Sequence, residues 1–249
     1  MDRIIRITLG LFLVILAGTV GYAVYSGYVT ESYRSTLTSS YSYSLSITTD
    51  QALNNVTLFI PVPADREGNS PVVSALSSHT IRSMPESWQT ILFDTGKATL
   101  VKIRIPAIIP PPGTTGDNPY TITVSADLPR DPVIDTRDPV ARDAVFRPVQ
   151  NFEAAECSGT GAGTGNPVCG TYDTSLYALY TADPSASVTI TTSISGQNHW
   201  TVFSPLSNEY RAVASATMKG AQKGWTTMKA TVNGGIGSFD YPFGLPQPS

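Results

Sequence analysis

The sequence predicts an all-β fold, a β-sandwich, preceded by a single N-terminal transmembrane helix. Three observations favour this fold class. Residues 7–29 are uncharged and mostly apolar, segments that alternate apolar and polar residues begin at residue 41, and turn residues separate these segments. Many short strands with hardly any helix are typical of a sandwich, and the length allows one large sandwich or two small ones.

The apolar segment 7–29 is long enough to cross a membrane. As a helix it would span about 34 Å, against about 30 Å for the hydrocarbon core. Its flanks carry the basic and aromatic residues typical of the two membrane surfaces, namely Arg3 and Arg6 before it and Tyr22, Tyr25 and Tyr28 near its end. We therefore expect the lipid bilayer as a partner, residues 1–6 in the cytoplasm and the rest outside. A cleaved signal peptide is the alternative, and it would export the chain too.

Composition divides the remaining chain. Residues 30–40 are rich in Ser, Thr and Tyr, and we interpret them as a stalk. Residues 41–245 carry the strand pattern and are predicted to form the sandwich ectodomain. Within them, residues 127–170 lack an apolar period and contain several prolines and a Gly-rich run. We expect a long excursion there, between two halves of the β structure, and a polar tail at residues 246–249.

The first predicted strand, residues 41–48, shows the period of two most clearly. Its apolar residues Tyr41, Tyr43, Leu45 and Ile47 alternate with Ser and Thr, so they are expected to face the core. A short helix is predicted at residues 71–79. Further strands are predicted at residues 56–62, 88–94, 98–105, 120–126, 176–180, 186–195, 200–203, 210–218, 226–232 and 237–241.

Charge is sparse and mixed in sign. Charged residues make up 14% of the chain and the net charge is −3. Typical domains are about one quarter charged, so Ser and Thr must provide much of the surface polarity here. No basic run follows the apolar segment, and this pattern excludes a nucleic-acid partner.

Two cysteines, Cys157 and Cys169, bracket a Gly-rich run. In an exported chain such a pair predicts a disulfide, which would stabilise the fold by about 3 kcal/mol through loop closure. A redox pair or a metal site would need closer spacing or more Cys and His nearby. The glycines recur at every second residue and match no phosphate-binding motif.

Acidic and basic residues alternate within the excursion. The carboxylates belong to Asp127, Asp131, Asp135, Asp138 and Asp143, and the guanidinium groups to Arg130, Arg137 and Arg142. Five carboxylates could hold Ca²⁺, but the EF-hand spacing is absent and the arginines nearly cancel the charge. We interpret this segment as a solvated, salt-bridged loop.

Catalytic signatures are missing from the sequence. His79 and His199 are the two histidines, and no metalloprotease or nucleophile-elbow motif is present. Either histidine could still join an Asp and a Ser in space. We predict no enzyme activity, no catalytic residue, no cofactor and no metal, with a hydrolase of unrecognised site as an alternative.

The tryptophans are the candidate binding residues. Trp88, Trp200 and Trp225 lie at or beside predicted strands, where large rings usually fill the core. Exposed together, they could instead form a platform for glycans. Asn55 begins an Asn-Val-Thr sequence, the formal acceptor of N-glycosylation on the exported side.

Two stretches carry a resemblance. They are Leu53-Asn-Asn-Val-Thr-Leu-Phe-Ile-Pro-Val-Pro, with Gly68-Asn-Ser-Pro-Val after it, and Gly196-Gln-Asn-His-Trp-Thr-Val-Phe, followed by Asn208-Glu-Tyr-Arg and Gly224-Trp225. Together they resemble an uncharacterised group of one-pass archaeal surface proteins. The resemblance implies an N-terminal anchor and a β-rich outer part, and it implies no catalytic residue.

These observations predict a membrane-anchored protein with a structural or interaction role at the cell surface. One alternative is a surface module that binds a ligand or a glycan. Another is a pilin-like filament subunit, which would require a processed leader before the apolar helix. Other surface proteins or glycans are the expected partners.

Overall fold

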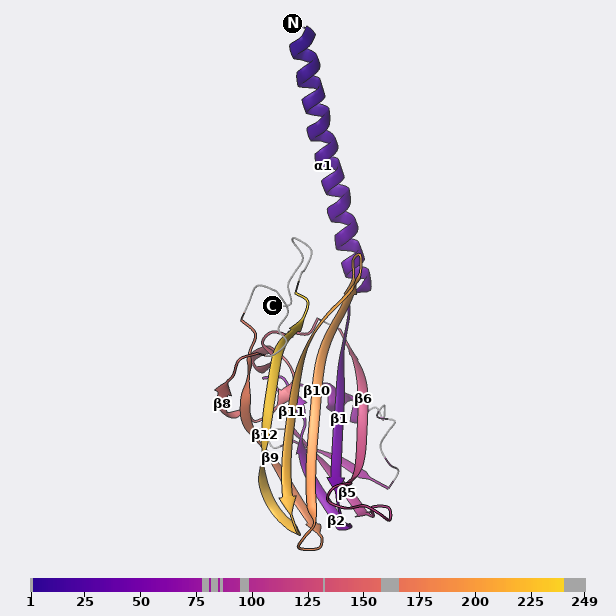
Figure 1. Cartoon of the computed structure of the whole chain (residues 1–249), viewed down its shortest axis with the longest axis vertical. Coiled ribbons are helices and arrows are strands. Elements are labelled where there is room, and N and C mark those ends of the chain that lie inside the picture. Colours follow the sequence, from indigo (N-terminus) through magenta and orange to yellow (C-terminus); the bar gives the residue numbers. More distant parts are fainter. Residues whose placement is uncertain are drawn as a thin grey trace.

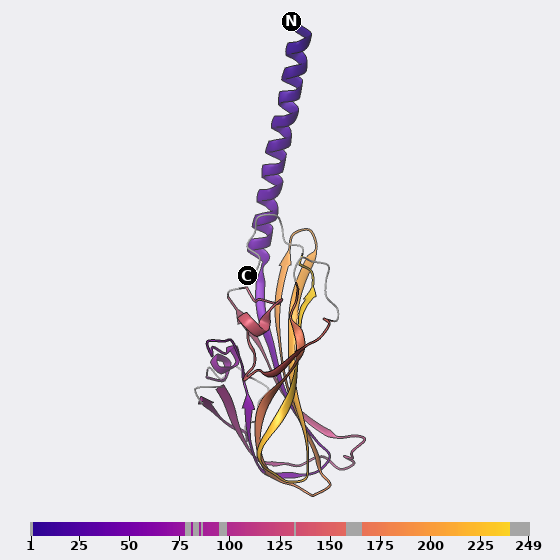
Figure 2. The same cartoon turned by 90° about the vertical axis from the view of Figure 1, so that its left-hand side faces the viewer.

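The computed structural model describes residues 2–77, 81, 85, 87–94, 99–131, 133–157 and 166–239. A long helix projects from one end of an elongated β body (Figures 1 and 2). The predicted tail at 246–249, His79 and the glycines between the two cysteines lie outside the described residues.

The N-terminal helix α1 (Asp2–Thr36) is continuous. It includes the predicted membrane segment and is the only described helix long and apolar enough to cross a bilayer. The residues interpreted as a stalk, 30–40, belong to regular elements: α1 continues through Thr36 and strand β1 starts at Thr38. Val29 and Tyr33, four residues apart and therefore on one helix face, are buried against the body. This packing keeps the last turns helical.

Two strand groups make up the body. The large sheet contains β1 (Thr38–Thr49), β2 (Leu53–Pro61), β4 (Gln89–Asp94), β5 (Thr99–Ile108), β6 (Tyr120–Arg130), β8 (Gln150–Ala154), β9 (Cys169–Thr181), β10 (Ser187–Thr201), β11 (Pro205–Lys219) and β12 (Gln222–Gly237). The small one pairs β3 (Pro63–Ala64) with β7 (Val145–Phe146). The short helices are α2 (Pro71–Ser77) and α3 (Pro139–Arg142).

The ten strands form one curled antiparallel sheet in the order β4-β5-β2-β9-β12-β11-β10-β1-β6, with β8 added beside β9. Long strands accumulate twist, so a sheet of this size curls around its own inner face (Figure 2). The predicted all-β body is confirmed. The two separate sheets of a sandwich are not confirmed, because the large sheet is continuous from β4 to β6.

The core lies on the inner face of the curled sheet. As the alternation predicts, Tyr41, Tyr43, Leu45 and Ile47 on β1 are all buried there. Ser and Thr face outward between them and pair with hydroxyls of neighbouring strands, as in the 2.8 Å contact of Ser44 with Ser193. Uncharged hydroxyl ladders thus cover much of the outer face.

The predicted strand 186–195 and the first half of the predicted strand 200–203 are in fact one long strand, β10, which ends at Thr201 before the turn that contains Val202 and Phe203. Residues 196–199, Gly-Gln-Asn-His, have the composition of a turn, but Gly196 and Asn198 make contacts on the inner face of the sheet. Gly196 lies against the ring of Tyr210 and the Ile134 side chain, with no room for a Cβ. Asn198 hydrogen bonds to the chain that crosses the inner face.

The central part of the excursion, residues 133–149, folds back over the inner face, while residues 127–130 continue strand β6 and residues 150–154 form the exposed strand β8 of the large sheet. Ile134, Val145 and Phe146 have no solvent exposure. The interpretation of the acidic part as a solvated loop is therefore wrong for Asp135 and Asp143, which are both buried. The open side of a curled sheet exposes apolar side chains, and this segment covers them.

Candidate functional site

A row of aromatic side chains crosses the outer face of the sheet. Its members are Phe93 on β4, Phe59 on β2, Tyr177 on β9 and Trp225 on β12, and we call them the aromatic row. Successive ring centroids are 5.8, 5.5 and 5.5 Å apart. Strand pairing produces this alignment, because Tyr177 lies directly opposite both Phe59 and Trp225.

The two ends of the aromatic row are the most exposed. Trp225 is 60% exposed and Phe93 is 50% exposed, with Ile91 and Leu179 adding apolar surface nearby. The ammonium group of Lys102 lies 5.3 Å from the Phe59 ring centroid, within cation–π range. A strip of exposed apolar side chains of this kind is a candidate interaction site, because most other side chains on this face are polar.

Successive rings of the aromatic row are close to perpendicular. Their interplanar angles are 82°, 89° and 71°. This edge-to-face order is the arrangement that aromatic quadrupoles favour, so the rings hold one another in place. The rings do not form one flat plane, and the surface suits separate stacking contacts better than a long planar ligand.

A shallow depression borders the aromatic row. It is lined by Asn55, Thr57, Gln89, Arg104 and Leu179, which come from strands β2, β4, β5 and β9. Donors and acceptors of amide, hydroxyl and guanidinium type therefore lie near the aromatic row. That combination can bind a polar ligand with apolar faces, because rings supply contact area while polar groups fix orientation.

The predicted glycosylation acceptor, Asn55, lines this depression. It is exposed and has a left-handed backbone (φ 53°), at an irregularity in the pairing of β2 with β9. Asparagine tolerates this conformation better than most residues, which gives a structural reason for its presence. A glycan attached here would cover part of the depression.

The three candidate tryptophans lie apart. Trp88 and Trp200 are buried, at 8% and 2% exposure, and Trp225 is exposed. Trp200 packs against Tyr33 of α1. Only Trp225 of the three can therefore contact a ligand. Phe59, Phe93 and Tyr177 were not among the binding residues predicted from the sequence. The alternation of apolar and polar residues in 56–62 could have predicted that Phe59 faces outward. The sequence does not show which strands pair, so it could not predict that these rings are neighbours.

The cysteine pair lies as predicted. The sulfur atoms of Cys157 and Cys169 are at disulfide distance and their Cα atoms are 5.3 Å apart. This geometry is that of a disulfide between the excursion and the start of β9. His199 lies on β10 with an exposed side chain, opposite Thr38 and Ser207 in the strand pairing.

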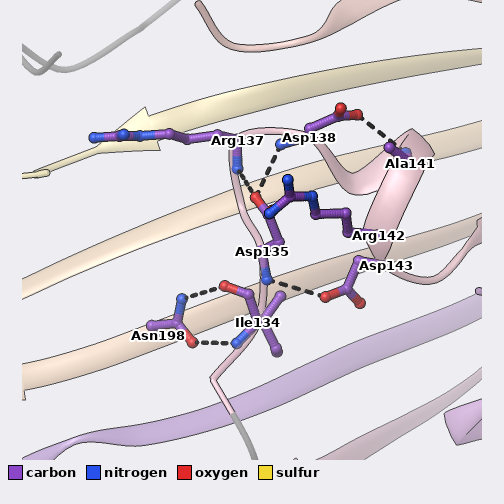
Figure 3. A network of polar contacts seen from close by, with 8 residues as sticks. All are labelled: Ile134, Asp135, Arg137, Asp138, Ala141, Arg142, Asp143 and Asn198. Atoms are coloured by element: carbon purple, nitrogen blue, oxygen red, sulfur yellow. Dashed lines mark hydrogen bonds and ion pairs between the residues drawn. The ribbon is translucent and has the colours of Figure 1, made fainter. Parts of the chain in front are cut away.

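The buried acidic residues hold the excursion on the inner face (Figure 3). Asp143 accepts hydrogen bonds from the Tyr41 hydroxyl and from the backbone N–H groups of Asp135 and Ala144. Asn198 bonds to both the N–H and the carbonyl of Ile134, at 3.0 and 2.9 Å. These contacts satisfy backbone N–H and carbonyl groups of a crossing segment that is not itself a strand.

Neighbouring acids have related roles. Asp135 accepts bonds from the N–H groups of Arg137 and Asp138 and lies 3.7 Å from the Arg142 guanidinium. Asp138 caps helix α3 through the Ala141 N–H. Among the described residues, no group of three or more His, Cys, Asp or Glu side chains could hold a metal ion. The carboxylates bind backbone groups instead.

Burial sets the protonation behaviour of this network. It raises the pKa of the Asp143 carboxyl, although the hydrogen bonds from Tyr41, Ala144 and Asp135 oppose that change. Burial and the neighbouring Asp143 also raise the pKa of the Tyr41 hydroxyl, which therefore stays protonated as a donor. The pair is thus suited to hold the crossing segment in place.

Comparison of the chain with known protein families, curated proteins and solved structures found no match. The resemblance to archaeal surface proteins therefore stays a prediction.

Proposed function

We propose that the protein is a membrane-anchored surface protein whose β body has a structural or interaction role and no catalytic one. The observation that carries this proposal is the exposure of α1. Large apolar side chains on all sides of the helix, such as Phe12, Leu13 and Val14, are more than half exposed. A helix that is hydrophobic all round requires an apolar surrounding, and the body supplies none.

The orientation follows from the flanks of α1. Arg3 and Arg6 lie at its start, and cytoplasmic ends of membrane helices carry an excess of positive charge. Residues 1–6 are then cytoplasmic and the sheet is extracytoplasmic. The disulfide pair agrees with this side, because disulfides persist in oxidising surroundings.

An alkaline carbonate wash combined with surface labelling tests this proposal. The intact chain should stay with washed membranes, and a membrane-impermeant amine reagent applied to whole cells should modify Lys219 and Lys223. Both lysines are exposed on the body. Release of the intact chain would contradict the anchor, and labelling of these lysines only after cell lysis would contradict the orientation.

The aromatic row favours one second function, binding of a surface glycan. Protein–carbohydrate contact combines aromatic rings with hydrogen-bonding groups, and the depression near the aromatic row offers Gln89 and Arg104. Because neighbouring rings are perpendicular, single sugar units would stack on separate rings. Binding of the purified protein to isolated cell-surface polysaccharides tests this function. If the protein binds none of them, the function is contradicted.

A further inference from the structure

The hairpin between β10 and β11 reaches back along α1. Residues 202–204 connect the two strands, and the ring of Phe203 lies 6.1 Å from the ring of Tyr25 and 6.0 Å from that of Tyr28. Figure 1 shows the hairpin extending to the lower part of the helix. The hairpin tip, as we call residues 202–204, thus lies beside the outer end of the proposed membrane span.

Two further contacts fix the hairpin against the helix. The Thr36 hydroxyl donates to the Thr201 carbonyl at 2.9 Å and accepts from the Thr201 N–H at 2.8 Å. About one turn earlier in the helix, Tyr33 meets Trp200 edge to face at 5.9 Å. The contacts recur at intervals that keep them on one helix face. The position of the tip along α1 is therefore set by packing.

The depth of the tip follows from the length of the span. Tyr25 and Tyr28 belong to the segment 7–29, whose length exceeds the hydrocarbon core by only about 4 Å. A ring level with these tyrosines lies at the boundary between acyl chains and headgroups. Phe203 is 69% exposed, and residues 201–206 carry no charge. Such an apolar tip has a low cost of entry into a lipid surface.

We propose that the hairpin tip inserts into the outer leaflet and forms a second membrane contact beside α1. This inference rests on the proposed anchor. Two contacts at different points prevent the body from swinging about the end of the helix, so the sheet stands on the membrane in one orientation. The aromatic row then lies at the end of the body that is far from the membrane. Gly237, at the end of β12, pairs with Asn208 near the hairpin tip, whereas Trp225 lies near the start of β12.

The test uses the full chain reconstituted in phosphatidylcholine vesicles, with one environment-sensitive fluorophore at a Phe203→Cys substitution. The matched control is Ala221→Cys, an exposed position in the turn between β11 and β12. That turn is about 50 Å away along the strands. Lipids carrying a nitroxide near the headgroup are then added. We expect a blue-shifted emission and strong quenching at position 203, and neither effect at position 221.

Each outcome decides a different claim. Quenching at 203 equal to that at 221, in chains that remain with the vesicles after a carbonate wash, would overturn the tip insertion and leave the anchor intact. A blue shift without quenching would also overturn it, since the tip would then contact protein and not lipid. Loss of the chain from the washed vesicles would instead overturn the anchor. Because Phe203 is exposed, its substitution should leave the fold unchanged, which circular dichroism can verify.

Discussion

At the scale of residues, a few buried polar side chains decide where the excursion lies. Asp143 and Asn198 bind backbone groups of the segment around Ile134, and Tyr41 closes the contact from β1. An unpaired buried polar group costs about 1–3 kcal/mol, so each partner contributes strongly. These contacts make the segment part of the core, although its acidic residues suggest a surface loop.

Titration of Asp143 should make stability depend on pH. An acid whose pKa is raised by folding stabilises the folded state below its unfolded pKa of about 3.9, and this contribution is lost as pH rises through the folded pKa. Between the unfolded and the folded pKa of Asp143, we expect the free energy of unfolding to fall as pH rises. The fall should be about 1.4 kcal/mol for each unit by which folding raises this pKa. Urea titrations of Asp143→Asn should lack this fall, while Asp131→Asn, at an exposed position, should keep it. An unchanged profile in Asp143→Asn would refute the assignment.

Gly196 is a second residue with a specific role. A Cβ there would collide with the Tyr210 ring and with Ile134, both buried. We expect Gly196→Ala to destabilise the protein by about 1–3 kcal/mol, as overpacking does. Gly116→Ala, where the added Cβ meets only an ordinary contact, should change stability by less than about 0.5 kcal/mol. Equal melting temperatures of the two variants would count against this account of the site.

At the scale of elements, strand pairing assembles the aromatic row from four strands. Phe59 and Tyr177 are far apart in the sequence and become neighbours because β2 pairs with β9. The same pairing places Gln89, Arg104 and Asn55 around one depression. The sheet therefore builds a surface that no single segment contains.

Trp225→Ala tests the aromatic row. Because the ring is 60% exposed, its loss should change the free energy of unfolding by less than about 1 kcal/mol. A large aromatic ring that a ligand covers contributes about 2 kcal/mol, so affinity for a surface glycan should fall about 30-fold. Isothermal titration of the detergent-solubilised full chain with an isolated cell-surface polysaccharide provides the measurement. Thr227→Ala, exposed on the same strand, should bind the glycan with unchanged affinity. An equal loss of affinity in both variants would contradict a binding role of the aromatic row.

At the scale of the whole molecule, α1 and the sheet are joined directly. The helix ends at Thr36 and β1 begins at Thr38, while Val29 and Tyr33 pack on the body. An irregular stalk would allow the body to move freely, and this junction does not. The proposed anchor and the orientation of the sheet are therefore mechanically linked.

Charges placed in the middle of α1 should abolish membrane retention. Arg at the centre of a membrane helix costs about 2.5–3.5 kcal/mol, so the double variant Leu13→Arg, Ile15→Arg should lose about 5–7 kcal/mol of insertion free energy. The chain should then appear in the supernatant of a carbonate wash. A control with Leu13→Ile and Ile15→Leu keeps the apolar character and should stay in the pellet. Retention of the doubly charged chain would contradict the span.

Much of the fold was accessible from local pattern. The alternation in residues 41–48 correctly predicted the inner face of β1, and the charge-free segment correctly predicted the long helix. The turn-like residues near Gly196 misled the prediction, because Gly and Asn serve there to admit Tyr210 and to bind Ile134. A local pattern cannot distinguish a turn from a strand residue that makes room for a distant partner.

By itself, the sequence determined that a long apolar helix precedes an all-β body, since both depend on periodicity and charge within single segments. Tertiary structure alone decided that the strands form one curled sheet, that Asp135 and Asp143 of the excursion are buried, and that Trp225 is exposed while Trp88 and Trp200 are not. The physical reason is that burial and strand order arise from contacts between residues far apart in the chain, which no local period encodes.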